Sequence, residues 1–237
     1  NSEWSKKQFL KNLQNFYHKS KKLIVIHQSI NPSKVDIKKK KKIISFVGKL
    51  NTAKGYDIFC KAIVKVLNRY PDWRAVVAGD EPREVINVNH KNLTNLGFQK
   101  HSKILDLFKK SSIAVACSRW EEPFGRTSLE AASRGCAVII SNRGGLPETI
   151  TNGIILRKLD AVNLYKSIIK LIENKKQLVD LQTKSKNNFY LTDTYISNKI
   201  DSYRSLLIGK PKNKLLIKND KDKLKILHIT NFNERHN

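Results

Sequence analysis

Short apolar runs alternate with amphipathic stretches between residues 43 and 207 of the chain. Most of the apolar runs are rich in Val, Ile and Ala and are too short to form helices, which is typical of strands buried on both faces of a parallel sheet. We expect strands at 43–48, 73–79, 92–98, 112–118, 136–141 and 152–156.

The stretches between these runs place apolar residues on one helical face. In residues 56–70 that face holds Ile58, Phe59, Ala62, Ile63, Val66 and Leu67. By the same spacing we expect helices at 56–70, 101–110, 126–135, 161–173, 175–188 and 194–207. Alternating strands and helices predict an α/β fold with a doubly wound, Rossmann-like parallel sheet and right-handed crossovers.

The two ends of the chain do not continue this repeat. Residues 21–34 are expected to form a strand and a turn, and residues 223–232 a second strand that follows the polar stretch 209–222. We interpret these segments as the edges of neighbouring domains. The lysine cluster 38–42 is interpreted as a solvated linker before the first strand of the repeat.

The loops that follow the expected strands are rich in Gly, Pro or charged residues. They span 48–55, 79–84, 97–102, 118–126 and 141–148. In a doubly wound sheet, ligands bind beyond the carboxyl ends of the strands, so these loops are the expected site. The first loop lacks the G-x-G-x-x-G pattern, which disfavours an NAD-dependent oxidoreductase.

The stretch "EEPFGRTSLEAASRG" (121–135) places a Pro-Phe-Gly turn directly before an expected helix. The unpaired N–H groups of a helix N-terminus form an anion site, and Gly125 allows a close approach of the backbone. Lys49 and Lys54 would add positive charge around a diphosphate, and Glu130 would reach a polar group such as ribose hydroxyls. The alternative is a solvated helix start whose carboxylates complement the helix dipole.

The formal net charge of +26 and a pI near 10.0 would suit a nucleic acid or an anionic membrane. The excess is mostly Lys scattered along the whole chain, which is typical of solvated surfaces. No RNA- or DNA-binding motif is recognisable, and the aromatic residues lack a stacking pattern, so nucleic acid is the disfavoured partner.

Cysteine and histidine usage bounds the compartment and the metal chemistry. Cys60, Cys117 and Cys136 lack C-x-x-C spacing and lie in apolar runs, so we expect small buried side chains in a reducing compartment. The six histidines lack ligand spacing, and no metal is expected. No apolar run approaches the roughly 18 residues of a membrane span. We expect a cytoplasmic protein, with peripheral contact to the inner face of a membrane as a further hypothesis.

Five segments in order carry a family resemblance: "FVGKLNTAKG", "VVAGDEP", "LGF", "CSRWEEPFGRTSLEAASRG" and "SNRGGLPE". Together they resemble the donor-binding C-terminal domain of retaining family-4 (group 1) glycosyltransferases of the GT-B fold, over about residues 22–207. The most specific element is Glu-x7-Glu, from Glu122 to Glu130, with its internal Phe-Gly.

The resemblance implies a role for each matched residue around a UDP- or GDP-sugar donor. Glu122 would face the sugar hydroxyls, and the backbones of Phe124 and Gly125 would donate N–H groups to the sugar. Arg126 and Thr127 would open the helix beneath the diphosphate.

The remaining residues of the implied site come from other loops. Gly48, Lys49 and Lys54 would line the diphosphate. Glu130 would hold the ribose, and the loop that contains Phe98 would receive the base. The resemblance implies neither a cofactor nor a metal.

The implied reaction transfers the sugar with retained configuration by front-face attack through an oxocarbenium-like transition state. Glu122, Lys49 and Lys54 are the expected catalytic residues. Other GT-B enzymes, namely a nucleotide-sugar epimerase or a phosphorylase, remain alternatives, as does a basic nucleic-acid-binding module.

The resemblance also suggests a division of the chain. Residues 1–42 resemble the tail of an acceptor-type domain with its linker, 43–208 the nucleotide-sugar-binding domain, and 209–237 a linker and the start of a further domain. The glycan or lipid-linked acceptor would lie on a domain outside this chain, so we expect the chain alone to bind nucleotide and to transfer little.

Overall fold

The computed structural model describes residues 1–12 and 23–208. Within them lies one six-stranded sheet in the order β3-β2-β1-β4-β5-β6, with every neighbouring pair parallel. The strands are β1 (Lys41–Val47), β2 (Arg74–Ala78), β3 (Leu93–Asn95), β4 (Ser111–Ala116), β5 (Ala137–Ser141) and β6 (Ile154–Leu156). The expected α/β doubly wound, Rossmann-like fold is confirmed.

Helices connect the strands at the expected places. They are α2 (Tyr56–Arg69), α3 (His101–Lys110), α4 (Arg126–Ser133), α5 (Ala161–Glu173), α6 (Lys175–Asn187) and α7 (Asp193–Ile208). Two short 3-10 helices, η2 (Ile37–Lys39) and η3 (Leu146–Thr149), and the helix α1 (Glu3–Asn12) were not expected. Boundaries differ from the expectation by at most two residues, apart from the end of β3, which was expected at residue 98.

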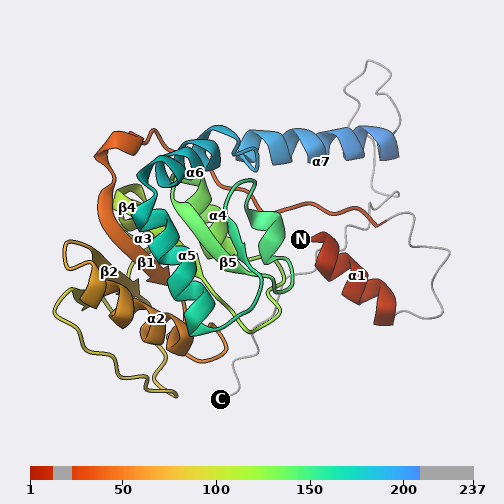
Figure 1. The fold of residues 1–237 in the computed structure, drawn as a ribbon. Coiled ribbons are helices and arrows are strands. Elements are labelled where there is room, and N and C mark those ends of the chain that lie inside the picture. The colour runs from red at the N-terminus through yellow and green to blue at the C-terminus, as the bar shows by residue number, and fades with distance from the viewer. Residues whose placement is uncertain (13–22, 209–237) are drawn as a thin grey trace. The chain divides into compact units, whose positions relative to one another are not determined.

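Successive residues of the central strands enter two separate cores, because side chains alternate between the faces of a sheet. Ile139 of β5 packs in the core with α2 and α5, whereas its neighbour Ile140 packs in the core with α3 and α4. Helices therefore cover both faces of the sheet, and Figure 1 shows α5 crossing the face nearer the viewer. This explains why the strands read as continuous apolar runs.

The prediction of a strand within residues 21–34 is wrong for residues 23–34, the part that the structure describes. Residues 23–34 follow an irregular path outside the sheet. Ile30 is buried in a small cluster with Phe124 and Leu129, and its backbone N–H donates to the carbonyl of Leu191 at 3.0 Å. Ile30 is thus buried by packing beside α4 and not by pairing with a strand.

The interpretation of residues 38–42 as a solvated linker is only partly correct, because Lys38, Lys39, Lys41 and Lys42 are exposed whereas Lys40 is not. β1 already begins at Lys41, and the side chain of Lys40 is directed into the protein. Its Nζ donates to the carbonyls of Phe108 at 2.9 Å and Ser111 at 2.7 Å. Lys40 therefore caps the carbonyl end of α3, where a cation is favourable, and burial lowers its pKa.

The chain divides into two compact units, residues 1–201 and residues 202–237, and only 202–208 of the second unit are described. The strand expected at 223–232 lies outside the described residues. None of the described helices is both long enough and apolar enough to cross a membrane. The expected burial of all three cysteines is confirmed.

Candidate functional site

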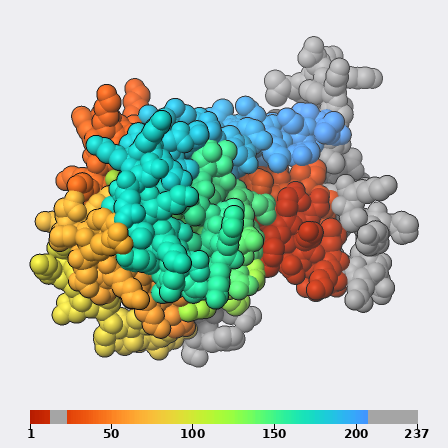
Figure 2. Space-filling view, viewed as in Figure 1, coloured from red at the N-terminus to blue at the C-terminus, as the bar shows by residue number. Residues whose placement is uncertain are grey.

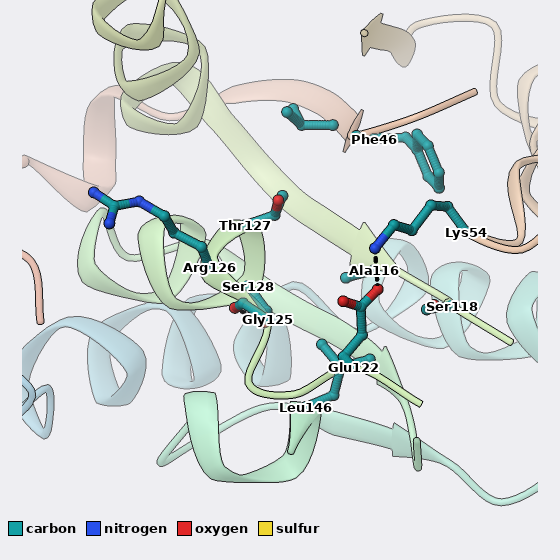
Figure 3. A pocket seen from close by; sticks show the side chains of 12 residues that line it. Phe46, Lys54, Ala116, Ser118, Glu122, Gly125, Arg126, Thr127, Ser128 and Leu146 are labelled. Carbon is teal, nitrogen blue, oxygen red and sulfur yellow. Dashed lines mark hydrogen bonds and ion pairs between the residues drawn. The ribbon is translucent and has the colours of Figure 1, made fainter. Parts of the chain in front are cut away.

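A pocket of about 250 Å³ opens at the carboxyl ends of β1 and β4, the two strands at which the sheet order reverses. Open α/β sheets bind their ligands at this switch point. The lining residues come from β1, β4, the loops that follow them, the start of α4 and η3 (Figure 3): Phe46, Val47, Gly48, Lys54, Ala116, Ser118, Glu122, Gly125, Arg126, Thr127, Ser128 and Leu146.

An ion pair joins opposite walls of this pocket. Lys54 Nζ lies 2.5 Å from Glu122 Oε1, and Figure 3 shows the two side chains pointing toward one another. Their side chains are 31% and 14% exposed. The pair places a cation and a carboxylate side by side in a partly desolvated space, where both act more strongly than in water.

The loop that carries Lys54 is held by the loop after β4. The carbonyl of Ala53 accepts the backbone N–H groups of Arg119 at 2.8 Å and Trp120 at 3.0 Å. The Arg119 guanidinium also binds both carboxylate oxygens of Asp57, at 2.5 and 2.7 Å, and its hydrogen bonds hold the pKa of Asp57 below its usual value. The position of Lys54 is therefore set by residues that follow β4.

Gly125 brings the chain from Glu122 into α4 through a conformation that only glycine adopts readily. Its φ is +107°, and a Cβ there would lie 2.5 Å from Leu146 Cδ2. Gly125 is also the N-cap of α4, and no side chain among the described residues caps its first turn. Backbone N–H groups of that turn are thus left for an anion, as the sequence predicted.

A second pocket of about 460 Å³ adjoins the first and shares Val47, Gly48, Arg126 and Thr127 with it. Its other lining residues come mainly from the loops after β1, β2 and β3 and from α3 and α4: Lys49, Ala78, Gly79, Asp80, Phe98, Gln99, His101, Ile104 and Glu130. The two pockets therefore lie next to each other at the carboxyl ends of the strands.

Glu130 is nearly buried in this second pocket, with 4% of its surface exposed. Its Oε1 accepts from Arg126 Nε and pairs with His101 Nε2, both at 2.8 Å. Sequence reasoning missed His101, although its place at the start of a helix directly after the loop of Phe98 could have indicated it. Arg126 is oriented by Glu130 through the spacing of four residues along α4.

Nine of the ten site residues predicted from the sequence line the two pockets. Gly48, Lys49, Lys54, Phe98, Glu122, Gly125, Arg126, Thr127 and Glu130 line one or both. The tenth, Phe124, is buried, and its ring stacks on that of His27. Only a backbone role near the ligand was expected of it. Within residues 1–12 and 23–208, no three or more His, Cys, Asp or Glu side chains are grouped to hold a metal ion.

A doubly wound domain with two lysines, two glutamates and an uncapped helix start at its switch point has the features of a nucleotide-binding domain. The family described as group 1 glycosyl transferases matches residues 27–188. The chain therefore belongs to the group 1 glycosyltransferase family.

Two curated relatives from Bacillus subtilis (strain 168) are similar to this chain. Spore coat protein SA is 35% identical over 126 residues, which are 48% of this chain and 33% of that protein. The putative glycosyltransferase YtcC is 27% identical over 194 residues, which are 73% of this chain and 47% of that protein. The matched region thus spans less than half the length of either relative.

Solved structures share the fold. A glycosyltransferase from Rickettsia africae has a TM-score of 0.68 at 20% identity, covering 88% of this chain and 62% of that one. Anabaena Alr3699/HepE in complex with UDP-glucose has a TM-score of 0.61 at 20% identity, covering 70% and 49%.

Proposed function

We propose that this chain is the donor-binding half of a glycosyltransferase that moves a sugar from a nucleotide-diphospho-sugar to an acceptor with retention of configuration. The observation that carries the proposal is the pair of adjoining pockets at the switch point. Two lysines, two glutamates and the start of α4 line these two pockets, which share four lining residues.

In this proposal the diphosphate lies at the start of α4, near the residues that both pockets share. Lys49 and Lys54 neutralise its charge, and the backbone of the first turn of α4 donates to it. Glu122 binds hydroxyls of the sugar in the smaller pocket. Glu130 binds the ribose in the larger pocket, with the base against the loop of Phe98.

The reaction breaks the bond between the anomeric carbon and the diphosphate oxygen, which leaves with the electron pair. The acceptor hydroxyl attacks the same face of the oxocarbenium-like centre, and its proton passes to the departing diphosphate oxygen. The chain's contribution is to position the donor and to stabilise the leaving diphosphate through Lys49, Lys54 and the dipole of α4. Removing one such preorganised group is expected to cost about 2.7–4 kcal/mol of transition-state stabilisation. We expect no requirement for a divalent metal, because these cations and the dipole take its place.

The donor is expected to be a UDP- or GDP-sugar. The complexes of HepE with UDP-glucose and with UDP support a nucleotide donor for this fold. A glycan or lipid-linked acceptor would lie on another domain, so transfer by this chain alone is expected to be weak or absent. We place the reaction in the cytoplasm, with or without peripheral contact to the inner face of a membrane.

Thermal unfolding in the presence of UDP, GDP, ADP and their sugars tests the proposal. A ligand at 100 times its dissociation constant should stabilise the chain by about 2.7 kcal/mol. The shift should be selective for one base and should be lost in Glu130→Gln. The matched control Glu173→Gln, on the exposed surface of α5, should keep it. A folded chain that no nucleotide stabilises, but that binds nucleic acid in a salt-dependent way, would support the basic-module alternative instead.

A further inference from the structure

Two segments from the beginning of the chain lie against the Pro123–Gly125 turn. The carbonyl of Pro123 accepts the hydroxyl groups of Ser2 at 2.5 Å and Ser5 at 3.0 Å. The ring of His27 stacks on Phe124, with 5.4 Å between centroids. The two residues that precede Gly125 are therefore held by parts of the chain outside the sheet and its crossover helices.

Glu148 of η3 connects both of these segments. Its carboxylate accepts the backbone N–H of Glu3 at 2.7 Å and that of Trp4 at 3.0 Å, and its Oε2 lies 3.1 Å from His27 Nε2. The two N–H groups belong to the first turn of α1, which has no intrahelical partners for them. A carboxylate at this position both caps the helix and complements its dipole. Figure 2 shows the atoms of residues 1–12 directly beside the green surface of the residues that follow β5.

The contact leaves no room for a side chain between the three segments. A Cβ on Gly145 would lie 2.6 Å from the Pro123 carbonyl oxygen and 2.9 Å from Ser2 Cβ. The N–H of Gly145 donates to the carbonyl of Glu122 at 2.6 Å. A shift at the start of α1 would therefore displace the turn that carries Glu122 and Gly125.

We propose that Glu148 is a positioning residue of the donor site. Its carboxylate holds the start of α1 and the ring of His27 against the Pro123–Gly125 turn, and this fixes where Glu122 and the backbone of Gly125 face the donor sugar. The inference rests on the proposed function. Glu148 is not among the described residues that line the two pockets, so it acts through the turn.

The position of the turn predicts which part of the donor is affected. Glu122 and Gly125 line the smaller, sugar-facing pocket, whereas Glu130 and Phe98 line the larger one. Loss of the Glu148 carboxylate should therefore weaken binding of the sugar and leave binding of the nucleotide nearly unchanged. If Glu148 only stabilised the fold, its substitution would lower the melting temperature without changing the ratio of the affinities for nucleotide-sugar and nucleotide.

Calorimetric titration of the whole chain with UDP, UDP-glucose, GDP and GDP-mannose tests the proposal. In Glu148→Gln, the dissociation constant of the nucleotide-sugar should rise about tenfold, as for other residues that orient a binding group. That of the matching nucleoside diphosphate should stay within about twofold, since no group that touches it is removed. Glu173→Gln removes a carboxylate from an exposed ion pair on α5 and serves as the matched control, with neither constant changed.

The double variant Ser2→Ala/Ser5→Ala provides an independent test if Glu148→Gln fails to fold. It removes the hydroxyl groups that bind the Pro123 carbonyl and keeps the Glu148 carboxylate. We expect the same selective loss of sugar affinity. If the dissociation constants of nucleotide and nucleotide-sugar changed equally, or if neither changed, the proposed role of Glu148 would be overturned and the proposed function would stand. A wild-type chain that binds none of the four ligands would overturn the proposed function and this inference with it. A wild-type chain to which the sugar adds no affinity would overturn the inference, because the turn would then face no sugar.

Discussion

The ion pair between Lys54 and Glu122 predicts opposite effects of two substitutions on the affinity for a nucleoside diphosphate. The ammonium of Lys54 lies 2.5 Å from the carboxylate of Glu122. A diphosphate that binds at the start of α4 must share this ammonium with the carboxylate, whose negative charge also repels it. Lys54→Met should therefore weaken the binding of UDP or GDP, whereas Glu122→Gln should strengthen it.

The two effects differ in size because the partners differ in charge and exposure. The side chains of Lys54 and Glu122 are 31% and 14% exposed, so solvent screens part of their attraction. Releasing Lys54 from such a pair is worth about 0.5–1 kcal/mol, or roughly a two- to fivefold gain in affinity. A hydrogen bond between an ammonium and a phosphate is worth about 1.5–3 kcal/mol. Its loss in Lys54→Met should raise the dissociation constant roughly 10- to 150-fold.

Isothermal titration calorimetry of the wild type, both single variants and the double variant measures these changes. Circular dichroism melting of each variant controls for folding. Raising the salt concentration should lower the affinity of the wild type for the nucleoside diphosphate more than that of Lys54→Met, because the variant lacks a charge that attracts the diphosphate. Glu122→Gln could instead weaken the binding of the nucleoside diphosphate as strongly as Lys54→Met does. The carboxylate would then orient the lysine and not compete for it, and the reasoning would be refuted.

Three further predictions concern stability and reactivity. The Asp57 pKa is lowered below 3.8 by Arg119, so the pair's contribution of about 1 kcal/mol should be complete above pH 3.8. It should disappear as the pH falls through the lowered pKa, which urea unfolding of the wild type and Asp57→Asn between pH 7 and pH 3 would show as converging stabilities. Gly125→Ala should lower the free energy of unfolding by about 1–3 kcal/mol, because its φ is +107° and its Cβ would lie against Leu146. An unchanged urea midpoint would contradict the strain. Burial raises the pKa of the Cys117 thiol to about 12, so this thiol should resist alkylation at pH 8 in the native chain and react once the chain is denatured. Labelling of the native protein, read by peptide mass spectrometry, would argue against that burial.

The fold was predictable because its signal is local and repeated. The central strands of the sheet are buried on both faces and therefore read as short apolar runs, and the helices between them show one apolar face. The expectation failed at residues 23–34, where Ile30 packs beside α4 and the chain does not pair in the sheet. Composition alone does not distinguish these two ways of burying the same side chains.

The content of the site was predictable for a geometric reason. The loops after parallel strands all open at one edge of the sheet, so the polar residues in them must meet there. The contributions of His27 and Glu148 were not predictable, because each depends on a contact with a segment remote in sequence. Glu148 reaches His27 across 121 positions of the chain.

The sequence by itself determined the succession of strands and helices along the chain, the edge of the sheet where ligand chemistry is expected, and the residues available there. Only the tertiary structure decided how those residues are paired. Lys54 and Glu122 are 68 positions apart and meet because β1 and β4 are neighbours in the sheet. Lys40 lies in a run of exposed lysines, yet its own side chain is partly buried because the end of α3 presents carbonyl groups to it. Such contacts depend on strand order and helix placement, which set distances that no local pattern of residues encodes.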